Sequence, residues 1–387
     1  MLIDIIAGAR PNFMKVAPII EAIHEAQRDG TPIAYRLVHT GQHSDKRMSA
    51  DFFEQLGIPE PHIKLDVPHG TQAEMTASIM TRYEKVLNDN RPDMVLVVGD
   101  VTSTLACAVT AKKMKDIPVA HVEAGIRSGD WSMPEEINRI VTDSVTDYFF
   151  TTSQTANENL RGSGIPDSHI YFVGNTMIDT LLKHRPRFRK PELWDELDLQ
   201  PQQYIVMTLH RPSTVDNPAK LKVMLEEIIA SSNGMQLVFP VHPRTARALE
   251  ITGVTAPNMH VTDPLPYLEF NYLVEHALAV VTDSGGITEE TTVMHVPCMT
   301  LRDTTERPET CIIGTNELLG THPGAIAPSF KALFSGSWKT GQIPERWDGH
   351  TAQRIVKVLC MVAESKWGMV EQASLSAEAG FARKISV

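Results

Sequence analysis

The chain lacks most of the features that mark membrane, secreted or zinc-binding proteins. No apolar run approaches the roughly 20 residues that a membrane-spanning helix needs. No basic stretch precedes the first apolar run, so we interpret the start as a β-strand and not as a signal peptide. The four cysteines form no Cys-x-x-Cys pair, and the 15 histidines form no His-Glu-x-x-His motif. We therefore expect buried free thiols, a reducing cytoplasm and no metal site.

Excess basic charge and a dinucleotide fingerprint are also missing. The formal net charge of −11 argues against a nucleic-acid binder. No Gly-x-Gly-x-x-Gly follows the first apolar run, so NAD is not indicated and we expect no cofactor. The chain also has no low-complexity segment and no short-period repeat. With 42% hydrophobic and 21% charged residues, the composition is typical of a globular enzyme.

The pattern of apolar runs predicts an α/β protein. At 387 residues the chain is too long for one typical core, so two domains are expected. Short apolar runs alternate with longer helical patterns in both halves, which predicts βαβ units and parallel sheets buried on both faces. The expected strands cover residues 2–7, 35–40, 94–98, 118–122 and 147–151, and then 204–209, 236–241, 259–261, 279–282 and 297–301.

A basic, proline-containing stretch at residues 183–191 divides the two series of strands and is typical of a connector. We predict two doubly wound Rossmann-like domains that face each other across a cleft. The N-terminal domain covers residues 1–178, the connector 179–200 and the C-terminal domain 201–365, which ends in an amphipathic helix at 351–364. The tail, residues 366–387, is expected to pack back on the N-terminal domain.

Charged residues in the first half follow predicted strands. The stretch His121-Val-Glu-Ala-Gly-Ile-Arg-Ser-Gly-Asp-Trp-Ser-Met-Pro-Glu-Glu-Ile-Asn-Arg139 follows a buried strand, at the edge where α/β sheets bind ligands. Its alternative interpretation is a solvated loop before an ordinary helix start. Asp100, after strand 94–98, is equally consistent with a helix cap and with an acid or base. Arg10 and Lys15 stand at a helix start that suits a phosphate, although Lys15 alone would be a surface lysine.

The second half contains features that suit phosphate. A strand runs into Ser284-Gly285-Gly286 and then into a helix, so a phosphate could approach the backbone, and Glu290 could bind ribose. The alternative is a glycine-rich turn with a serine cap. His210 and His242 each end a strand close to an arginine, which suits pyrophosphate or proton transfer; either alone would more often be structural.

Together these positions predict a nucleotide diphosphate held by the second domain. A neutral group would then face the carboxylates Asp100, Glu123 and Glu135 of the first domain, which could act as acids and bases. The charged loop Arg302-Asp-Thr-Thr-Glu-Arg307 adds to the same edge of the second sheet.

The chain resembles the non-hydrolysing UDP-N-acetylglucosamine 2-epimerases over nearly its whole length. The resemblance implies the two-domain fold of GT-B glycosyltransferases, a homodimer, and interconversion of UDP-GlcNAc and UDP-ManNAc without NAD for surface polysaccharide synthesis. It rests on Gly8-Ala-Arg-Pro-Asn-Phe-Met-Lys15, Thr40-Gly-Gln-His43, Gly99-Asp100, His121-Val-Glu-Ala-Gly-Ile-Arg127, Pro134-Glu-Glu-Ile-Asn-Arg139, Gly174-Asn-Thr176, His210-Arg211, Pro240-Val-His242, Asp283-Ser-Gly-Gly-Ile287 and Arg302-Asp-Thr-Thr-Glu-Arg-Pro308.

The resemblance also implies a role for each candidate residue. UDP would leave across C1–C2 to give a 2-acetamidoglucal and then add back with the opposite C2 configuration. The implied catalytic residues are Asp100, Glu123 and Glu135 as acids or bases, with Lys15 and His210 assisting the departure of UDP. The implied substrate-binding residues are Arg10, Arg139, His242, Phe270 near uracil, Ser284, Gly285, Gly286 and Glu290.

The chain departs from the family pattern at three positions. Asn12 stands where many members carry an acid, Pro212 changes the common His-Arg-Arg-Glu, and Asp45 replaces a glutamine. The last two belong to the activating substrate pocket of regulated members, so the resemblance does not carry substrate activation to this chain. Four alternatives stay open: an epimerase for a diacetamido uronic acid nucleotide, a hydrolysing relative that releases ManNAc and UDP, a GT-B glycosyltransferase, and a non-catalytic regulator that binds nucleotide sugars.

Overall fold

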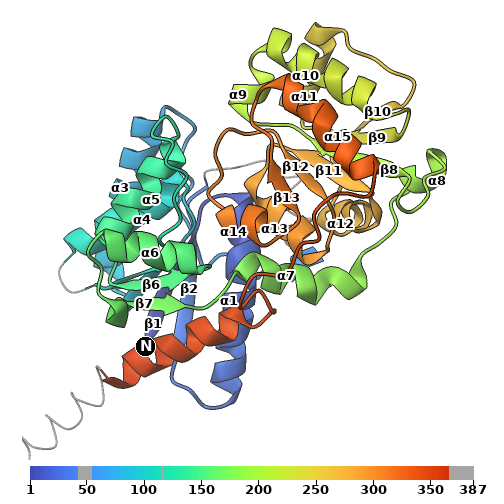
Figure 1. The fold of residues 1–387 in the computed structure, drawn as a ribbon. Helices are drawn as coiled ribbons and strands as arrows, with labels where there is room; N and C mark the ends of the chain where they lie inside the picture. The colour runs from blue at the N-terminus through green and yellow to red at the C-terminus, as the bar shows by residue number, and fades with distance from the viewer. Residues whose placement is uncertain (42–54, 115–116, 366–387) are drawn as a thin grey trace, which may run out of the picture.

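The computed structural model describes residues 1–41, 55–114 and 117–365, which form two α/β domains, each built on one parallel sheet (Figure 1). The first sheet has the strand order β3-β2-β1-β4-β5-β6-β7, and the second has the order β10-β9-β8-β11-β12-β13. The strands are β1 Leu2–Ala7, β2 Ala34–His39, β3 Ile63–Lys64, β4 Met94–Val98, β5 Val119–Val122, β6 Tyr148–Thr151, β7 Ile170–Phe172, β8 Tyr204–Thr208, β9 Gln236–Pro240, β10 Met259–Thr262, β11 Ala279–Thr282, β12 Cys298–Thr300 and β13 Asn316–Leu318.

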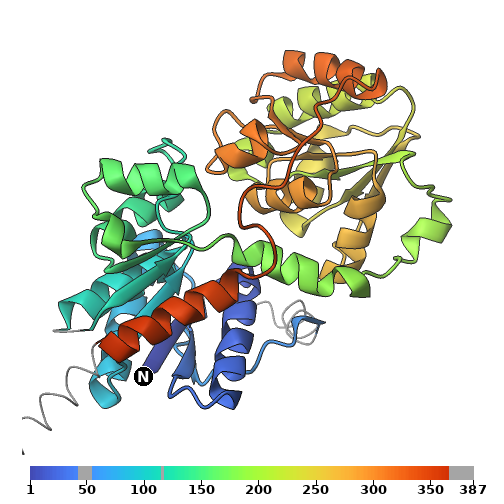
Figure 2. The same ribbon diagram turned by 60° about the horizontal axis from the view of Figure 1, so that its bottom comes forward.

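Helices cover both faces of each sheet, as doubly wound topology requires (Figures 1 and 2). The prediction of two doubly wound domains is therefore confirmed. The α-helices are α1 Arg10–Arg28, α3 Gln72–Asp89, α4 Thr102–Lys113, α5 Pro134–Ser144, α6 Gln154–Gly162, α7 Thr176–His184, α8 Leu193–Glu196, α9 Pro212–Val215, α10 Pro218–Ser231, α11 Pro243–Thr252, α12 Tyr267–His276, α13 Gly285–Val293, α14 Pro308–Ile312 and α15 Ile326–Phe334.

The inner strands β1 and β8 are largely apolar because each has a buried core on either face. On β1, Ile5 belongs to one hydrophobic cluster and Ile6 to the cluster on the opposite face. On β8, Ile205 and Val206 divide in the same way. Both side-chain rows therefore have to be apolar, and the alternation of polar and apolar residues that marks a half-exposed strand is absent from these two strands.

Both sheets reverse their strand order at one point, between β1 and β4 and between β8 and β11. Loops that leave such neighbouring strands in opposite directions open a crevice at the carboxyl edge, where α/β proteins bind ligands. Gly99 follows β4 in the first sheet, and Asp283 follows β11 in the second. The switch points thus place the charged loops of both halves at ligand-binding edges.

Helix α7 joins the two domains by contacting α1 on one side and α13 on the other (Figure 1). The hydroxyl of Thr180 donates to the backbone oxygen of Met14 at 2.6 Å. The side-chain amide of Asn175 donates to Glu289 Oε1 at 2.8 Å. The predicted connector therefore begins with a helix that contacts both domains.

The helix over residues 351–365 returns to the first domain and lies along it (Figure 2). Ile355 and Leu359 join the core beside β1, and Asp179 accepts hydrogen bonds from the amides of Thr351 and Ala352 at 3.1 and 2.7 Å. The sequence-based division placed this helix in the second domain, whereas its apolar face completes the first core. The predicted tail, 366–387, lies outside the described residues. Among those described, no helix combines the length and apolarity needed to cross a bilayer.

Candidate active site

A cleft of about 1030 Å³ lies between the carboxyl edges of the two sheets. Because both domains line it, the predicted cleft between facing Rossmann-like domains is present. It brings together ten of the residues singled out from the sequence: Lys15, Asp100, Glu135, Arg139, His210, Phe270, Ser284, Gly285, Gly286 and Glu290.

Two other predicted site residues, Glu123 and His242, are not among the described residues that line the cleft. Glu123 is buried behind Lys15, which contacts it. His242 is exposed at the start of α11, where its ring accepts the amide of Arg244 at 3.4 Å. The side chain of Arg10 lies outside the described part of the structure, as do Gln42, His43 and Asp45.

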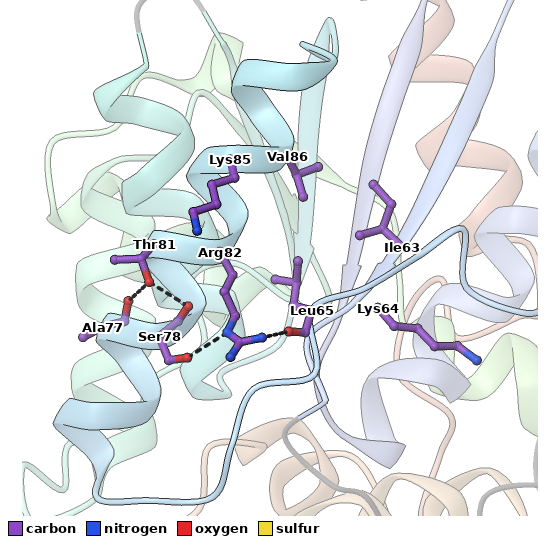
Figure 3. A pocket seen from close by; sticks show the side chains of 9 residues that line it. All are labelled: Ile63, Lys64, Leu65, Ala77, Ser78, Thr81, Arg82, Lys85 and Val86. Atoms are coloured by element: carbon purple, nitrogen blue, oxygen red, sulfur yellow. Dashed lines mark hydrogen bonds between the residues drawn. The ribbon is translucent and has the colours of Figure 1, made fainter.

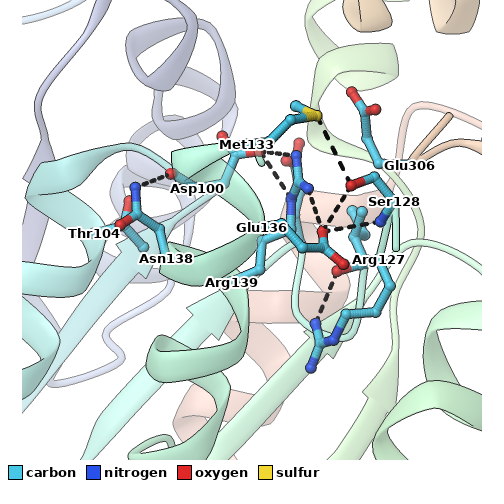
Figure 4. A network of polar contacts seen from close by, with 12 residues as sticks. Asp100, Thr104, Arg127, Ser128, Met133, Glu136, Asn138, Arg139 and Glu306 are labelled. Atoms are coloured by element: carbon cyan, nitrogen blue, oxygen red, sulfur yellow. Dashed lines mark hydrogen bonds and ion pairs between the residues drawn. The ribbon is translucent and has the colours of Figure 1, made fainter. Parts of the chain in front are cut away.

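Asp100 is held by two residues of α5 (Figure 4). Arg139 donates to Asp100 Oδ2 from Nε at 3.0 Å and from Nη2 at 2.5 Å, and Asn138 donates to the backbone oxygen of Asp100 at 2.8 Å. Burial would raise the pKa of Asp100, but Arg139, Lys15 and Arg307 outweigh it and lower the pKa. The carboxylate is therefore ionised at neutral pH, which is the state that a general base needs.

Glu123 occupies a strained turn directly after β5. Its φ of +69° is the left-handed conformation that non-glycine residues rarely adopt. Its Oε2 accepts Lys15 Nζ at 2.7 Å and Arg307 Nη2 at 3.2 Å, while its buried Oε1 has no hydrogen-bond partner among the described residues. Strain and an unsatisfied buried acceptor are both costly, and such costs concentrate at functional sites.

Gly99 turns beneath these groups. Its φ is +68°, and a Cβ there would lie 3.2 Å from Lys15 Nζ and 3.6 Å from Glu123 Oε2. Glycine is needed both for the backbone conformation and for the close approach of the ion pair.

Glu135 and His210 complete the polar lining between the domains. Glu135, in the first turn of α5, makes no hydrogen bond or ion pair within the described part of the chain. His210 Nδ1 lies 3.0 Å from Oδ1 of buried Asp283, which also accepts the backbone amides of His210 and Arg211. Burial favours a raised pKa for Asp283, but hydrogen bonding to His210 and these amides lowers it. An ionised Asp283 thus fixes the orientation of the His210 ring, which suits proton transfer or contact with a phosphate.

The second domain presents the start of α13 to the cleft at Ser284, Gly285 and Gly286. A Cβ on Gly285 would lie 2.4 Å from Glu306 Oε1, whereas a Cβ on Gly286 would meet nothing closer than Met177 Cε at 3.9 Å. Arg302 donates from Nη2 to Glu306 at 2.6 Å, and its buried Nη1 has no partner among the described residues. Free helix amides beside an unsatisfied guanidinium nitrogen suit a phosphate.

The part of the cleft formed by α12 and α13 lies next to this start of α13. Tyr267 donates its hydroxyl to Glu290 Oε1 at 3.1 Å, and Phe270 lines the cleft one turn further along α12. Burial raises the pKa of Glu290 from 4.5 to about 7. An aromatic face beside a hydrogen-bonded carboxylate suits a base and its ribose.

Arg307 was not singled out as a site residue, although the charged loop that contains it was. It bonds Glu289 through Nε and reaches Glu123 of the first domain through Nη2 at 3.2 Å. Burial is offset by Glu289 and Glu123, which hold its pKa well above the ordinary value. A permanently charged Arg307 therefore links the two domains at the inner end of the site. The signal in the sequence was the run of charge after strand 297–301.

A second hollow lies on the first domain between β3 and α3 (Figure 3). Arg82 is already engaged there, because it donates to Leu65 O at 2.7 Å and to Ser78 Oγ at 3.2 Å. Across the residues described, no group of three or more His, Cys, Asp or Glu side chains is arranged to hold a metal ion.

Comparison with known proteins gives one consistent family. The sequence profile of the UDP-N-acetylglucosamine 2-epimerase family matches residues 25–360. A UDP-N-acetylglucosamine 2-epimerase of Methanocaldococcus jannaschii is 37% identical over 93% of this chain and 99% of its own. A Pseudomonas aeruginosa UDP-2,3-diacetamido-2,3-dideoxy-D-glucuronate 2-epimerase is 40% identical over 85% and 91%. The crystal structure of the M. jannaschii UDP-GlcNAc 2-epimerase in complex with UDP-GlcNAc and UDP has a TM-score of 0.83, 37% identity and coverage of 93% and 99%.

Proposed function

The chain belongs to the UDP-N-acetylglucosamine 2-epimerase family, and we propose that it reversibly converts UDP-GlcNAc into UDP-ManNAc without releasing a free sugar. The observation that carries the proposal is the difference between the residues that the two domains place on either side of the cleft. Asp100 and Glu135 line its first-domain side, whereas the glycine turn at the start of α13 and Arg302, which suit a phosphate, line its second-domain side.

The reaction breaks the C2–H bond and the bond from C1 to the UDP oxygen. A base takes the C2 proton, the C–H electron pair forms the C1=C2 double bond, and UDP leaves with the C1–O electrons. UDP then adds back to C1 of the 2-acetamidoglucal while a proton is delivered to the opposite face of C2. Two faces require more than one acid or base, for which Asp100, Glu123 and Glu135 are our candidates.

UDP departs with negative charge, which the second domain is built to stabilise. The start of α13 and Arg302 would hold the phosphates, and His210, Lys15 and Arg10 would assist the departure. Glu290 and Phe270 would hold ribose and uracil. A UDP-sugar as the substrate is supported by the M. jannaschii relative, which was solved in complex with UDP-GlcNAc and UDP. Arg139 would act by orienting Asp100, and a contact of His242 with substrate stays a prediction.

A diacetamido uronic acid nucleotide is the second candidate substrate. The P. aeruginosa relative, at 40% identity, is named for a reaction on such a sugar. Arg211 lines the cleft, where it donates to Met133 Sδ at 3.8 Å and its ion pair with Glu306 is long, at 3.9 Å. An incompletely neutralised cation there could bind the carboxylate of a uronic acid. A homodimer and a place in surface polysaccharide synthesis belong to the proposal through family resemblance alone.

Product analysis tests the proposal. The protein is incubated with UDP-GlcNAc, and with the diacetamido uronic acid nucleotide in parallel, and the products are followed by proton NMR. We expect UDP-ManNAc to form from UDP-GlcNAc until the two reach equilibrium. Free ManNAc plus UDP would indicate a hydrolysing enzyme, and turnover of the uronic acid nucleotide alone would indicate the second substrate. Transfer to an added acceptor, or binding without turnover, would indicate the glycosyltransferase or the regulator.

A further inference from the structure

His121 and Asp143 form a buried pair directly behind the acid/base loops of the first domain. His121 lies on β5 and Asp143 on α5, and they are 0% and 4% exposed. His121 Nδ1 is 2.7 Å from Asp143 Oδ1, and His121 Nε2 is 2.8 Å from the backbone oxygen of Gly99. Since Gly99 immediately precedes Asp100, the pair reaches one acid/base loop through its backbone.

The direction of these hydrogen bonds follows from the chemistry of the partners. The Gly99 carbonyl can only accept, so Nε2 of His121 carries a hydrogen. Asp143 Oδ2 accepts the Gly125 amide at 3.1 Å and pairs with Arg127 Nη1 at 2.7 Å. Burial would raise the pKa of Asp143, but His121 and Arg127 outweigh it and lower the pKa. The ionised carboxylate of Asp143 at Nδ1 and the Gly99 carbonyl at Nε2 hold the ring from both sides, which fixes its orientation.

Asp143 also holds the second acid/base loop without an intermediary. Gly125 stands two residues after Glu123, and its amide donates to Asp143 Oδ2. The backbone has little room there, since a Cβ on Gly125 would lie 2.4 Å from Ala156 O. One carboxylate therefore sets the position of two loops, one through His121 and one directly.

Helix α5 adds two more restraints on the Asp100 loop. Asn138 donates to the Asp100 backbone oxygen, and Arg139 donates to its carboxylate (Figure 4). Glu135, Arg139 and Asp143 are spaced four residues apart, so they follow one side of the helix. A shift of α5 would move Glu135 and both braced loops together.

We propose that Asp143 is a positioning residue that aligns the loops of Asp100 and Glu123 through His121 and Gly125. The inference rests on the proposed epimerisation and assigns Asp143 no contact with substrate. Misplacing an acid or base by about 1 Å can cost roughly 10²-fold in rate. Loss of the Asp143 contacts with His121 and Gly125 should thus reduce turnover far more than it reduces the binding of UDP by the second domain.

The test compares Asp143→Asn with Asp4→Asn. Asp4 is also a buried carboxylate of the first domain, bonded by Arg36 at 2.7 Å and Tyr83 at 2.9 Å, and it contacts neither loop. We expect Asp143→Asn to lower kcat about 10- to 100-fold while KM and UDP affinity stay within about threefold. Hydrogen–deuterium exchange should speed up at the amides of Gly99 and Gly125 in Asp143→Asn and stay unchanged there in Asp4→Asn.

Two further outcomes keep the inference separate from the proposed function. Should Asp143→Asn fail to fold, His121→Phe removes the link to Gly99, because the phenyl ring has no N–H donor, and leaves the bond from Gly125 to Asp143 in place. This variant should speed exchange at Gly99 and lower kcat. The inference would be overturned if the Asp143 and His121 variants matched Asp4→Asn both in turnover and in hydrogen–deuterium exchange at the two loops. A wild-type protein that does not epimerise UDP-GlcNAc would overturn the proposed function, while the exchange comparison would still decide whether Asp143 holds both loops.

Discussion

The two domains share one topology and differ in what they place at its switch point. When the strands of each domain are numbered from its own first strand, the second sheet repeats the strand order of the first over six strands. In the first domain the loops after β4 and β5 carry the carboxylates Asp100 and Glu123. In the second, the loops after β11 and β12 carry serine, glycine and arginine. The fold thus supplies the same place twice, and the residues at the strand ends decide its chemistry.

The domains also hold their functional groups by different means. The candidate acid/base groups of the first domain depend on buried side-chain partners from α5, on a left-handed glycine turn at Gly99 and on a strained turn at Glu123. The proposed phosphate site of the second domain, at the start of α13, depends on main-chain amides and on the close approach of other groups to the backbone at Gly285. Substitutions in the first should therefore affect the rate, and those in the second should affect UDP binding.

The largest effect is expected from the carboxylates of the first domain. Asp100→Asn and Glu123→Gln should each lower turnover by at least ~10²-fold, because a positioned acid or base contributes ~10²–10⁴-fold. Affinity for UDP, measured by calorimetry, should change less than about tenfold. Asp167→Asn, an exposed carboxylate of the same domain, serves as the control. Near-normal turnover in both variants would remove these residues from the mechanism and weaken the contrast between the domains.

A smaller effect, on binding, is expected in the second domain. Gly285→Ala places a methyl 2.4 Å from Glu306 Oε1, so Glu306 and its partner Arg302 must move. We expect UDP to bind about tenfold more weakly, equivalent to ~1.4 kcal/mol. Gly162→Ala is the control, because Gly162 does not line the cleft and a methyl there would meet nothing within 4 Å. Equal affinities in both variants would place the phosphates away from this turn.

A third effect is expected on the pH dependence of stability. Burial raises the pKa of Glu290 to about 7 from 4.5, so the carboxyl of Glu290 keeps its proton up to a higher pH in the folded protein than in the unfolded chain. The contribution of Glu290 to stability therefore falls as pH rises from about 4.5 to about 7, by at most ~1.4 kcal/mol per pH unit.

Glu290→Gln removes this titration. Its thermal midpoint relative to the wild type should rise across the interval between pH 4.5 and 7, while Glu226→Gln, at an exposed position of α10, should show no such trend. A constant difference for Glu290→Gln would show that Glu290 titrates normally and that its pocket is better hydrated than its burial implies.

The strands could be predicted because burial on both faces leaves long apolar runs. The edge strands β3, β7 and β13, of two or three residues, gave no such run and were not predicted. The last helix was assigned to the second domain because it follows that domain along the chain. Its packing against the first core depends on a chain crossing that has no local signature.

The candidate site was predictable where chemistry follows a strand, as at Asp100 and Ser284. The supporting residues were not. Asp143 and Asn138 look like ordinary polar positions of an amphipathic helix, and their partners are 22 and 38 residues away in sequence. The contact of Arg307 with Glu123 spans 184 residues and two domains, so no local pattern could predict it.

The central claim is that groups of the first domain remove and return the C2 proton while the second domain holds UDP. Its most direct test is turnover of UDP-GlcNAc in D₂O, with the isotope at C2 followed by proton NMR and mass spectrometry. The account predicts that product UDP-ManNAc carries deuterium at C2, because the proton leaves on one face and solvent-exchanged groups return another. Epimerisation at C2 with full retention of the original hydrogen would contradict it, together with the roles proposed for Asp100, Glu123 and Glu135.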